Sequence, residues 1–189
     1  MIKKIFSFVR KSQRSSKDKI TYIIPRSVIC DTERVLSEYA KIKPSNEGFV
    51  YWGGIIDGTI ISISLVIAPE TESSYGRVST SNRSNFDVVK TLSANKVIEI
   101  AQVHSHPSDL VDHSEGDDEW ASFKIEGLVS IVVPQYCKKG MLPLTDCGIH
   151  IYTNGDFIRL SKKYVTEHFK IINDSKSGFI DLRRTFHVR

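Results

Sequence analysis

The chain has 189 residues, of which 40% are hydrophobic and 25% are charged. This length and composition suit one domain with a core of its own, flanked by tails. The three scattered cysteines form no Cys-x-x-Cys pair, which excludes a disulfide framework and a cysteine-based zinc finger and indicates a reducing compartment. The apolar run IFSFV near the N-terminus is too short for a secretory signal or a membrane span. We therefore expect a cytoplasmic protein.

The net charge of +4 averages three different regions. Residues 1–19 carry seven Lys and Arg against one Asp, and residues 161–189 carry seven against three acidic residues. Residues 20–160 carry twelve against eighteen, so the middle of the chain is acidic. We therefore predict a domain over 20–160, with a basic N-terminal extension and a basic C-terminal helix or tail. Short basic ends mainly aid solubility, so neither a nucleic acid nor a membrane is expected as a partner.

In chain order, the first predicted elements are a strand, a helix and a hairpin. ITYIIP at 20–25 is typical of a strand, and residues 27–42 follow as a helix whose Val28, Val35, Leu36 and Ile42 share an apolar face. Residues 47–69 predict two strands joined at the Asp-Gly pair of IDGT. Residues 70–85 are polar and predict a surface loop.

The second half alternates helices and strands. Residues 86–96 and 117–127 predict helices, the second ending at Gly127, and residues 97–106 and 128–134 predict strands. Residues 148–160 predict a hairpin that turns at Asn-Gly. Helices mixed with adjacent hairpins indicate an α/β or α+β fold with a mixed sheet flanked by helices, and not a doubly wound parallel sheet.

The stretch HSHPSDLVDHSEGDDEW, residues 104–120, holds three of the six histidines and a run of carboxylates. His104 and His106 are two apart at the end of a strand, so both imidazoles project to one face and can bind one metal ion. Pro107 turns the chain, and Asp117 at the start of a helix can return as an oxygen ligand. Two His and one Asp leave one tetrahedral position of Zn²⁺ open, and zinc lowers the pKa of a water in that position to about 7. Such a water still needs a carboxylate as general base.

This stretch resembles the signature of the JAB/MPN metalloproteases, the JAMM motif. The signature is His-x-His-Pro, six residues, Ser, two residues and Asp, and the chain matches it without a gap at five positions: His104, His106, Pro107, Ser114 and Asp117. The family also has a glutamate at the start of a strand some fifty to sixty residues upstream, a place that Glu47 in EGFVYWGG fits. Val50 stands where many members have glycine, and the lead-in to the motif is AQV instead of GxW.

The resemblance, which covers most of residues 20–160, implies a curved mixed sheet flanked by helices, as in cytidine deaminases. It implies that His104, His106 and Asp117 bind one Zn²⁺ and that Glu47 is the general base and then the general acid. Ser114 would donate a hydrogen bond to the tetrahedral oxyanion. By its position, Ser114 is also a plausible N-cap of the following helix.

The family is best known for isopeptidases that hydrolyse the bond between the C-terminal glycine of ubiquitin or a ubiquitin-like modifier and a lysine. A chain of this size looks like the standalone bacterial and archaeal members, many of which are similar to enzymes encoded beside ubiquitin-activating and ubiquitin-conjugating homologues in anti-phage operons. The resemblance thus implies a ubiquitin-like protein or its conjugates as the partner. Two alternatives stay open: a zinc amidase or peptidase with a small-peptide or cell-wall substrate, and a non-catalytic MPN scaffold.

Several side chains have competing interpretations. Asp118 could replace Asp117 as a ligand. Two other glutamates could take the role of Glu47, but they fit it less well, because Glu38 lies inside a predicted helix and Glu70 in a predicted loop. We expect His113 to be exposed or to face a substrate, and His150 to point outward from its strand. Trp52 and Trp120 are expected in the core. Cys137 and Cys147 are expected to be partly buried and without a role in the chemistry. A cysteine as a removable fourth zinc ligand is a further alternative.

Overall fold

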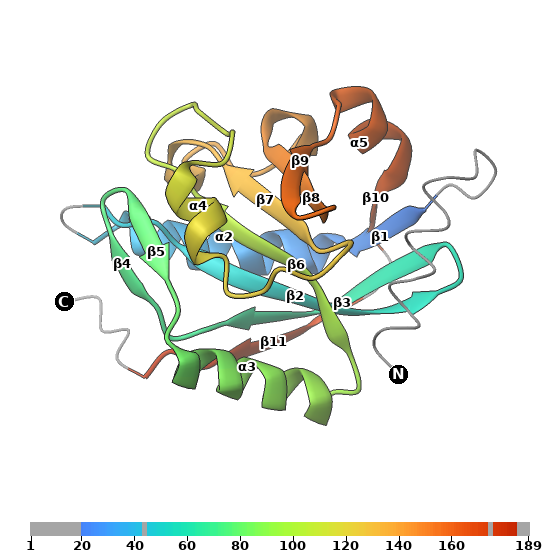
Figure 1. Cartoon of the computed structure of the whole chain (residues 1–189), viewed down its shortest axis with the longest axis horizontal. Helices are drawn as coiled ribbons and strands as arrows, with labels where there is room; N and C mark the ends of the chain where they lie inside the picture. Colours follow the sequence, from blue (N-terminus) through green and yellow to red (C-terminus); the bar gives the residue numbers. More distant parts are fainter. Residues whose placement is uncertain (1–19, 43–44, 174–175, 185–189) are drawn as a thin grey trace.

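A computed structural model describes residues 20–42, 45–173 and 176–184 of the chain. Nine of its strands belong to one sheet: β1 (Thr21–Pro25), β2 (Phe49–Asp57), β3 (Ile60–Ala68), β6 (Ile98–Ser105), β7 (Val129–Val133), β8 (Gly148–Thr153), β9 (Asp156–Arg159), β10 (Phe169–Ile172) and β11 (Gly178–Asp181). Their order is β10-β1-β3-β2-β6-β7-β8-β9, with β11 also paired to β3. Four neighbouring pairs are parallel: β1–β10, β1–β3, β11–β3 and β6–β7. The other pairs are antiparallel. The predicted mixed sheet flanked by helices is confirmed (Figure 1).

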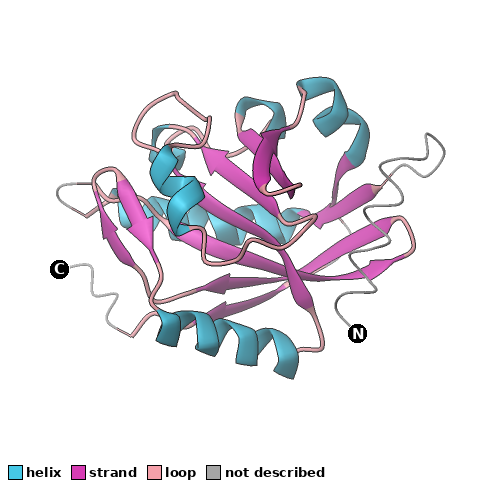
Figure 2. Cartoon of the chain, viewed as in Figure 1, coloured by secondary structure: helices cyan, strands magenta, loops and turns pink. Residues whose placement is uncertain are grey.

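Four α-helices flank the curled sheet: α2 (Arg26–Ala40), α3 (Asn82–Ala94), α4 (Glu115–Trp120) and α5 (Lys162–His168). Figure 2 shows α2 behind the sheet and α3 below it. Two short 3₁₀ turns, at Gln135–Cys137 and Leu144–Asp146, follow β7. No helix among the described residues is both long and apolar enough to cross a lipid bilayer.

Both faces of the central strands are buried, each in its own apolar cluster. Along β2, Val50 and Trp52 join the large core that includes α2, whereas Phe49 and Tyr51 join a smaller cluster under α3. This alternation follows from the two-residue period of a strand. Trp52 is 1% exposed, as expected for a core residue, while the side chain of Trp120 lies outside the described part. The predicted apolar face of α2 is also confirmed at Val28, Val35 and Leu36, which are fully buried.

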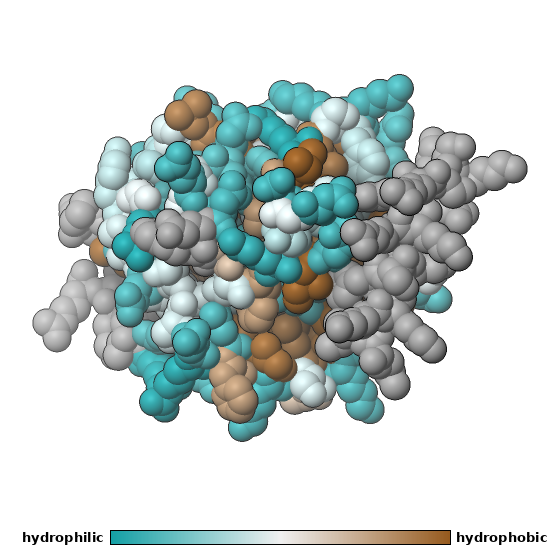
Figure 3. All heavy atoms as spheres, viewed as in Figure 1, coloured by the Kyte–Doolittle hydropathy of each residue, from teal (hydrophilic) through white to brown (hydrophobic). Residues whose placement is uncertain are grey.

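On the surface, hydrophilic atoms cover much of the described part of the face in Figure 3, and hydrophobic atoms gather near its middle. Large exposed apolar side chains are scattered over several elements, for example Phe86 on α3 and Leu110 in the turn after β6. Such scattered exposure is normal for a folded domain.

Two local predictions were wrong. Residues 70–85, expected as a loop, contain a small hairpin of β4 (Glu72–Ser74) and β5 (Arg77–Ser79). Three-residue strands without apolar alternation leave no periodic signal for a prediction to detect. The helix expected over 117–127 spans Glu115–Trp120 only, because its capping serine lies at Ser114 and the chain leaves the helical conformation at Ala121.

The segment after residue 160 belongs to the main sheet over its described part. Residues 161–189 were expected as a helix or tail, and α5 supplies the helix, but β10 pairs with β1 and β11 with β3. Val165 and Phe169 are buried in the large core. The basic segment 1–19 and residues 185–189 lie outside the described residues.

Candidate metal centre

The two histidines of the motif lie where β6 ends in the middle of the sheet. His104 is the next to last residue of β6 and pairs with Phe49 of β2 and Val132 of β7. His106 follows the strand, and its backbone N–H donates to the carbonyl of Val133. The side chains of His104 and His106 are directed to the same region, with Nε2 atoms 3.2 Å apart. As the period of a strand predicts, Ser105 points elsewhere, and its hydroxyl accepts the N–H of Gly48.

Helix α4 brings Asp117 to the two imidazoles. Ser114 is its N-cap and forms a reciprocal capping box with Asp117: the Ser114 hydroxyl accepts the Asp117 N–H, and the carboxylate accepts the Ser114 N–H at 2.7 Å. The predicted N-cap is therefore confirmed. Asp117 Oδ1 lies 3.2 Å from His104 Nε2, and Oδ2 lies 3.1 Å from His106 Nε2.

The donor set and its spacing fit a tetrahedral metal ion. All three ligand atoms lie within 4.8 Å of one another. Bonds of about 2.0–2.1 Å to a tetrahedral zinc ion place neighbouring ligand atoms about 3.3 Å apart. The Nε2 atoms of His104 and His106 are 3.2 Å apart, close to this value, and each of them lies 3.1 to 3.2 Å from a different carboxylate oxygen of Asp117. Lone pairs that face one another at such distances repel unless a cation or a proton lies between them.

The turn after β6 fixes which nitrogen of His106 faces the other ligands. His106 Nδ1 donates to the carbonyl of Leu110 at 2.9 Å, so in the neutral imidazole Nε2 carries no proton and can bind a metal ion; in the charged imidazolium Nε2 donates to Asp117 instead. The turn can lie close to β8 because residue 148 is glycine: a Cβ there would lie 1.7 Å from the carbonyl oxygen of Val111. A glycine inside a strand pattern signals such a close approach, so Gly148 could have been noticed in the sequence.

Glu47 is buried near two of the ligands, His106 and Asp117. It is 3% exposed, precedes β2, and its N–H donates to the carbonyl of Ser74 in β4. Burial raises the pKa of its carboxyl group to about 8, with the nearby His106 opposing and Asp117 reinforcing the rise. A carboxyl group with a pKa near neutrality suits a group that must both accept and donate a proton.

Charges of opposite sign also shift the pKa values of two ligands. Burial alone would raise the pKa of Asp117, but hydrogen bonds from His104 and His106 outweigh burial and hold it well below its ordinary range. Burial alone would lower the pKa of His106, but its hydrogen bond to Asp117 and the negative charge there raise it. The three ligands therefore form one strongly coupled electrostatic unit.

The rivals considered from the sequence lie apart from this unit. Asp118 accepts a hydrogen bond from His113 at 2.8 Å instead. Glu38 forms ion pairs with two arginines, and Glu70 accepts a backbone N–H near the C-terminus. Among the described residues, the only group of metal-ligating atoms is the triad, and it contains neither Cys137 nor Cys147. Both of these cysteines are buried, more fully than expected.

The expectations for two histidines were wrong. His113 was expected to be exposed or to face a substrate, and His150 to point outward. Only 5% of the His113 side chain is exposed, His150 is 3% exposed, and their ring centroids lie 4.1 Å apart. Alternation in β8 does not lead His150 to solvent, because the loop that carries His113 covers that face of the strand.

Sequence reasoning also missed Tyr136. Gln135, Tyr136 and Cys137 all have φ between 52° and 62°, a left-handed conformation that costs about 1–2 kcal/mol per residue outside glycine. This turn lets the Tyr136 N–H donate to the carbonyl of His106 at 2.8 Å, and its hydroxyl donates to the carbonyl of Tyr75 at 2.7 Å. Tyr136 therefore links the metal-ligand strand to the hairpin β4–β5. Nothing in the local sequence VVPQYCKKG predicts this conformation.

A small pocket of about 20 Å³ opens beside the ligands. Val78 of β5 and Thr80 just after it line one part of the pocket, and His104 of β6 lines another. Asp117 of α4 and Ser122 of the segment after α4 also line it. The hydroxyls of Thr80 and Ser122 are hydrogen-bonded across it at 2.5 Å. The pocket has room for one or two water-sized groups next to the ligands.

Comparison with known proteins defines the fold only. No protein-family model matches this sequence, and no curated protein matches it. Among solved structures, the chain is similar to the solution structure of protein DSY2949 from Desulfitobacterium hafniense, with a TM-score of 0.57. The match covers 90% of this chain and 100% of that chain, at 16% sequence identity. At this identity the likeness shows that the two chains share a fold and says nothing about a shared activity.

Proposed function

We propose that this chain is a zinc-dependent isopeptidase or peptidase of the JAB/MPN type. It would remove or mature a ubiquitin-like modifier by hydrolysis after the modifier's C-terminal glycine. The observation that carries the proposal is the arrangement of His104, His106 and Asp117, whose ligand atoms lie within 4.8 Å of one another, with Glu47 buried near His106 and Asp117. The spacing of the motif in the sequence supports the same family.

Zinc is the proposed ion because two imidazoles and one carboxylate, leaving one position open, form a ligand set typical of catalytic zinc sites. Bound zinc would act as a Lewis acid that polarises the carbonyl oxygen of the scissile bond and lowers the pKa of a water molecule. The hydrogen bond from His106 Nδ1 to Leu110 orients one ligand for this task.

Glu47 would transfer the protons of the reaction. Its carboxylate takes a proton from the attacking water, and the resulting carboxylic acid then gives that proton to the leaving lysine amine. Burial raises the pKa of this carboxyl group to about 8 in the metal-free protein, and the positive charge of a bound ion would lower it, which favours the carboxylate needed for the first step.

Ser114 would donate to the oxyanion that develops on the scissile carbonyl. Its hydroxyl donates to Asp117 Oδ2 at 2.9 Å in this structure, so this role requires the hydroxyl to exchange one acceptor for another.

The surroundings of the ligands favour a slim substrate. The pocket of about 20 Å³ beside the ligands is small, which suits a glycine residue next to the scissile bond. The short strand β5 borders this pocket, and an extended tail could pair with such an edge. We propose that the enzyme acts in the cytoplasm and that its partner is a ubiquitin-like protein or its conjugates. Ubiquitin-activating and ubiquitin-conjugating homologues of an anti-phage operon would act in the same pathway.

The test combines metal content with cleavage. Purified protein is loaded with zinc, its metal content is measured by mass spectrometry, and it is given a model conjugate in which a Gly-Gly tail is joined to a lysine amine. We expect one zinc per chain and cleavage after the second glycine. Glu47→Gln should keep the zinc and lose about 10²- to 10⁴-fold in kcat, because the general base is gone.

Glu167→Gln, on the exposed surface of α5, is the matched control and should cleave like the wild type. Absence of zinc binding by the wild type would refute the proposed metal site. Zinc binding with cleavage of an ordinary peptide but not of the Gly-Gly-lysine conjugate would refute the proposed substrate class.

A further inference from the structure

Helix α4 carries the ligand Asp117, and its described side chains are polar. None of its described side chains belongs to either apolar cluster, and Glu115 and Asp118 are exposed. The capping box joins Asp117 only to Ser114, three residues away, so it does not attach the helix to the sheet. Ser122, beyond the helix, is bonded to Thr80. Among the described side chains of the helix, polar contacts are what join it to the sheet.

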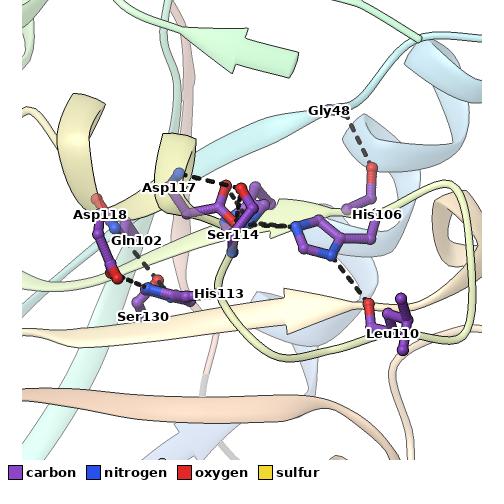
Figure 4. Close-up of polar contacts among 11 residues, drawn as sticks. Gly48, Gln102, His106, Leu110, His113, Ser114, Asp117, Asp118 and Ser130 are labelled. Carbon is purple, nitrogen blue, oxygen red and sulfur yellow. Dashed lines mark hydrogen bonds and ion pairs between the residues drawn. The ribbon is translucent and has the colours of Figure 1, made fainter. Parts of the chain in front are cut away.

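One of these contacts is a continuous hydrogen-bond chain beside the metal ligands (Figure 4). Gln102 Nε2 of β6 donates to Ser130 Oγ of β7 at 3.2 Å. His113 Nε2 lies 2.9 Å from the same hydroxyl, and His113 Nδ1 lies 2.8 Å from Asp118 Oδ1. With His113 neutral, the donors run from Gln102 through Ser130 and His113 to the carboxylate of Asp118, and the His113 proton is on Nδ1.

The chain joins the two elements that carry the metal ligands. Gln102 is two residues before His104 on the same strand, and Asp118 is the neighbour of Asp117 on α4. The imidazole in the middle is held in place by aromatic rings: His150 lies 4.1 Å and Phe157 lies 4.7 Å from it between ring centroids. His113 thus forms a rigid, buried link between helix and sheet.

We infer that His113 is a positioning residue of the metal centre: by linking Asp118 to Ser130, it holds α4 so that Asp117 meets His104 and His106 in a preformed ligand set. This inference rests on the metal site of the proposed function, and it does not depend on which bond the enzyme cuts. His113 itself is not a ligand. Groups that orient metal ligands from behind typically contribute a factor of about 10 to 100 to metal affinity.

The experiment measures zinc affinity of the full chain by competition with a chromophoric chelator, together with the visible spectrum of the Co²⁺-substituted protein. His113→Ala should weaken zinc binding about 10- to 100-fold and alter the Co²⁺ spectrum, because Asp117 loses its fixed position. Ser130→Ala and Asp118→Ala break the same chain at its other links and should weaken binding in the same direction. Asp118→Asn keeps an oxygen acceptor for His113 and should restore most of the affinity.

Two controls separate positioning from charge and from general stability. Glu115→Gln removes one exposed charge from the same helix and should change zinc affinity less than twofold. His168→Ala removes another buried histidine, which is bonded to the carbonyl of Ile20, and should lower the melting temperature without changing the Co²⁺ spectrum.

Zinc affinity of His113→Ala within twofold of the wild type would overturn the inference and leave the proposed function standing. If His113→Ala does not fold, Ser130→Ala and Asp118→Ala decide by the same criterion. A wild type that binds no zinc would instead overturn the metal site itself.

Discussion

At the scale of single residues, Glu47 is the side chain whose chemistry depends most on its surroundings. In water its carboxyl group would be ionised at neutral pH, but it is 3% exposed and lies among His106, Asp117 and Tyr136. Burial penalises the carboxylate and raises the pKa to about 8. The folded protein therefore binds a proton at Glu47 that the unfolded chain releases at a much lower pH.

The metal-free protein should consequently lose stability as the pH rises from about 5 to about 8. In this window Glu47 is protonated in the folded state and ionised in the unfolded state, so the free energy of unfolding falls with pH. Glu47→Gln should show a smaller fall. Urea unfolding in a chelator at several pH values measures both slopes.

His106 also has a raised pKa, and Glu47 is the smallest of its causes, so most of the His106 contribution is common to both proteins. The part that Glu47→Gln removes also makes the fall with pH smaller. The lowered pKa of Asp117 affects stability only at acid pH. Equal slopes for the wild type and Glu47→Gln would show that Glu47 is not protonated in the folded state.

At the scale of elements, the hairpin β4–β5 is attached to the site from two sides. The N–H of Glu47 donates to the carbonyl of Ser74 at 2.9 Å, and the hydroxyl of Tyr136 donates to the carbonyl of Tyr75 at 2.7 Å. The hairpin is a separate two-stranded sheet, so its position over the site depends on such contacts more than on pairing with the main sheet.

Tyr136→Phe should therefore loosen the hairpin while keeping the ring in place. Loss of one such hydrogen bond corresponds to about 1 kcal/mol, or about a fivefold increase in local opening. Hydrogen exchange of the backbone amides of β4 and β5 measures this change. Tyr152→Phe, whose ring packs on Phe157, is the control and should leave these amides unchanged. Unaltered hairpin exchange in Tyr136→Phe would contradict the role of this hydroxyl.

At the scale of the whole molecule, the two ends of the described chain meet in one sheet. β1 lies between β10 and β3, and β11 pairs with β3 beyond the end of β1. Phe169 of β10 stacks on Tyr22 of β1 with ring centroids 4.3 Å apart. Unfolding of the C-terminal segment would uncover this part of the large core, so the segment should unfold together with the rest.

Phe169→Ala should accordingly lower the free energy of unfolding by about 3–5 kcal/mol, the usual loss for a buried phenylalanine. The matched substitution Phe86→Ala, at a position 67% exposed on α3, should change it by less than about 0.5 kcal/mol. Urea titrations followed by tryptophan fluorescence compare the two. Similar effects, or a separate early transition in Phe169→Ala, would show that the C-terminal segment is not part of the cooperative unit.

The sequence by itself determined the elements with strong periodicity and the short-range part of the site. The strands β2, β3 and β6 and the helix α2 were predicted because alternation and helical spacing are local properties. The approach of His104, His106 and Asp117 was also predictable, since a strand end, a proline turn and a capped helix bring together residues only thirteen positions apart.

Only the tertiary structure decided the surroundings of those residues. The burial of Glu47, which sets its pKa, depends on β4, β6 and the turn at Tyr136, and these are distant in the sequence. The same is true of His113 and His150, whose polarity predicted exposure, although a loop and a strand from different parts of the chain bury both. Burial is a property of all neighbours together, whereas local sequence patterns report only on neighbours along the chain.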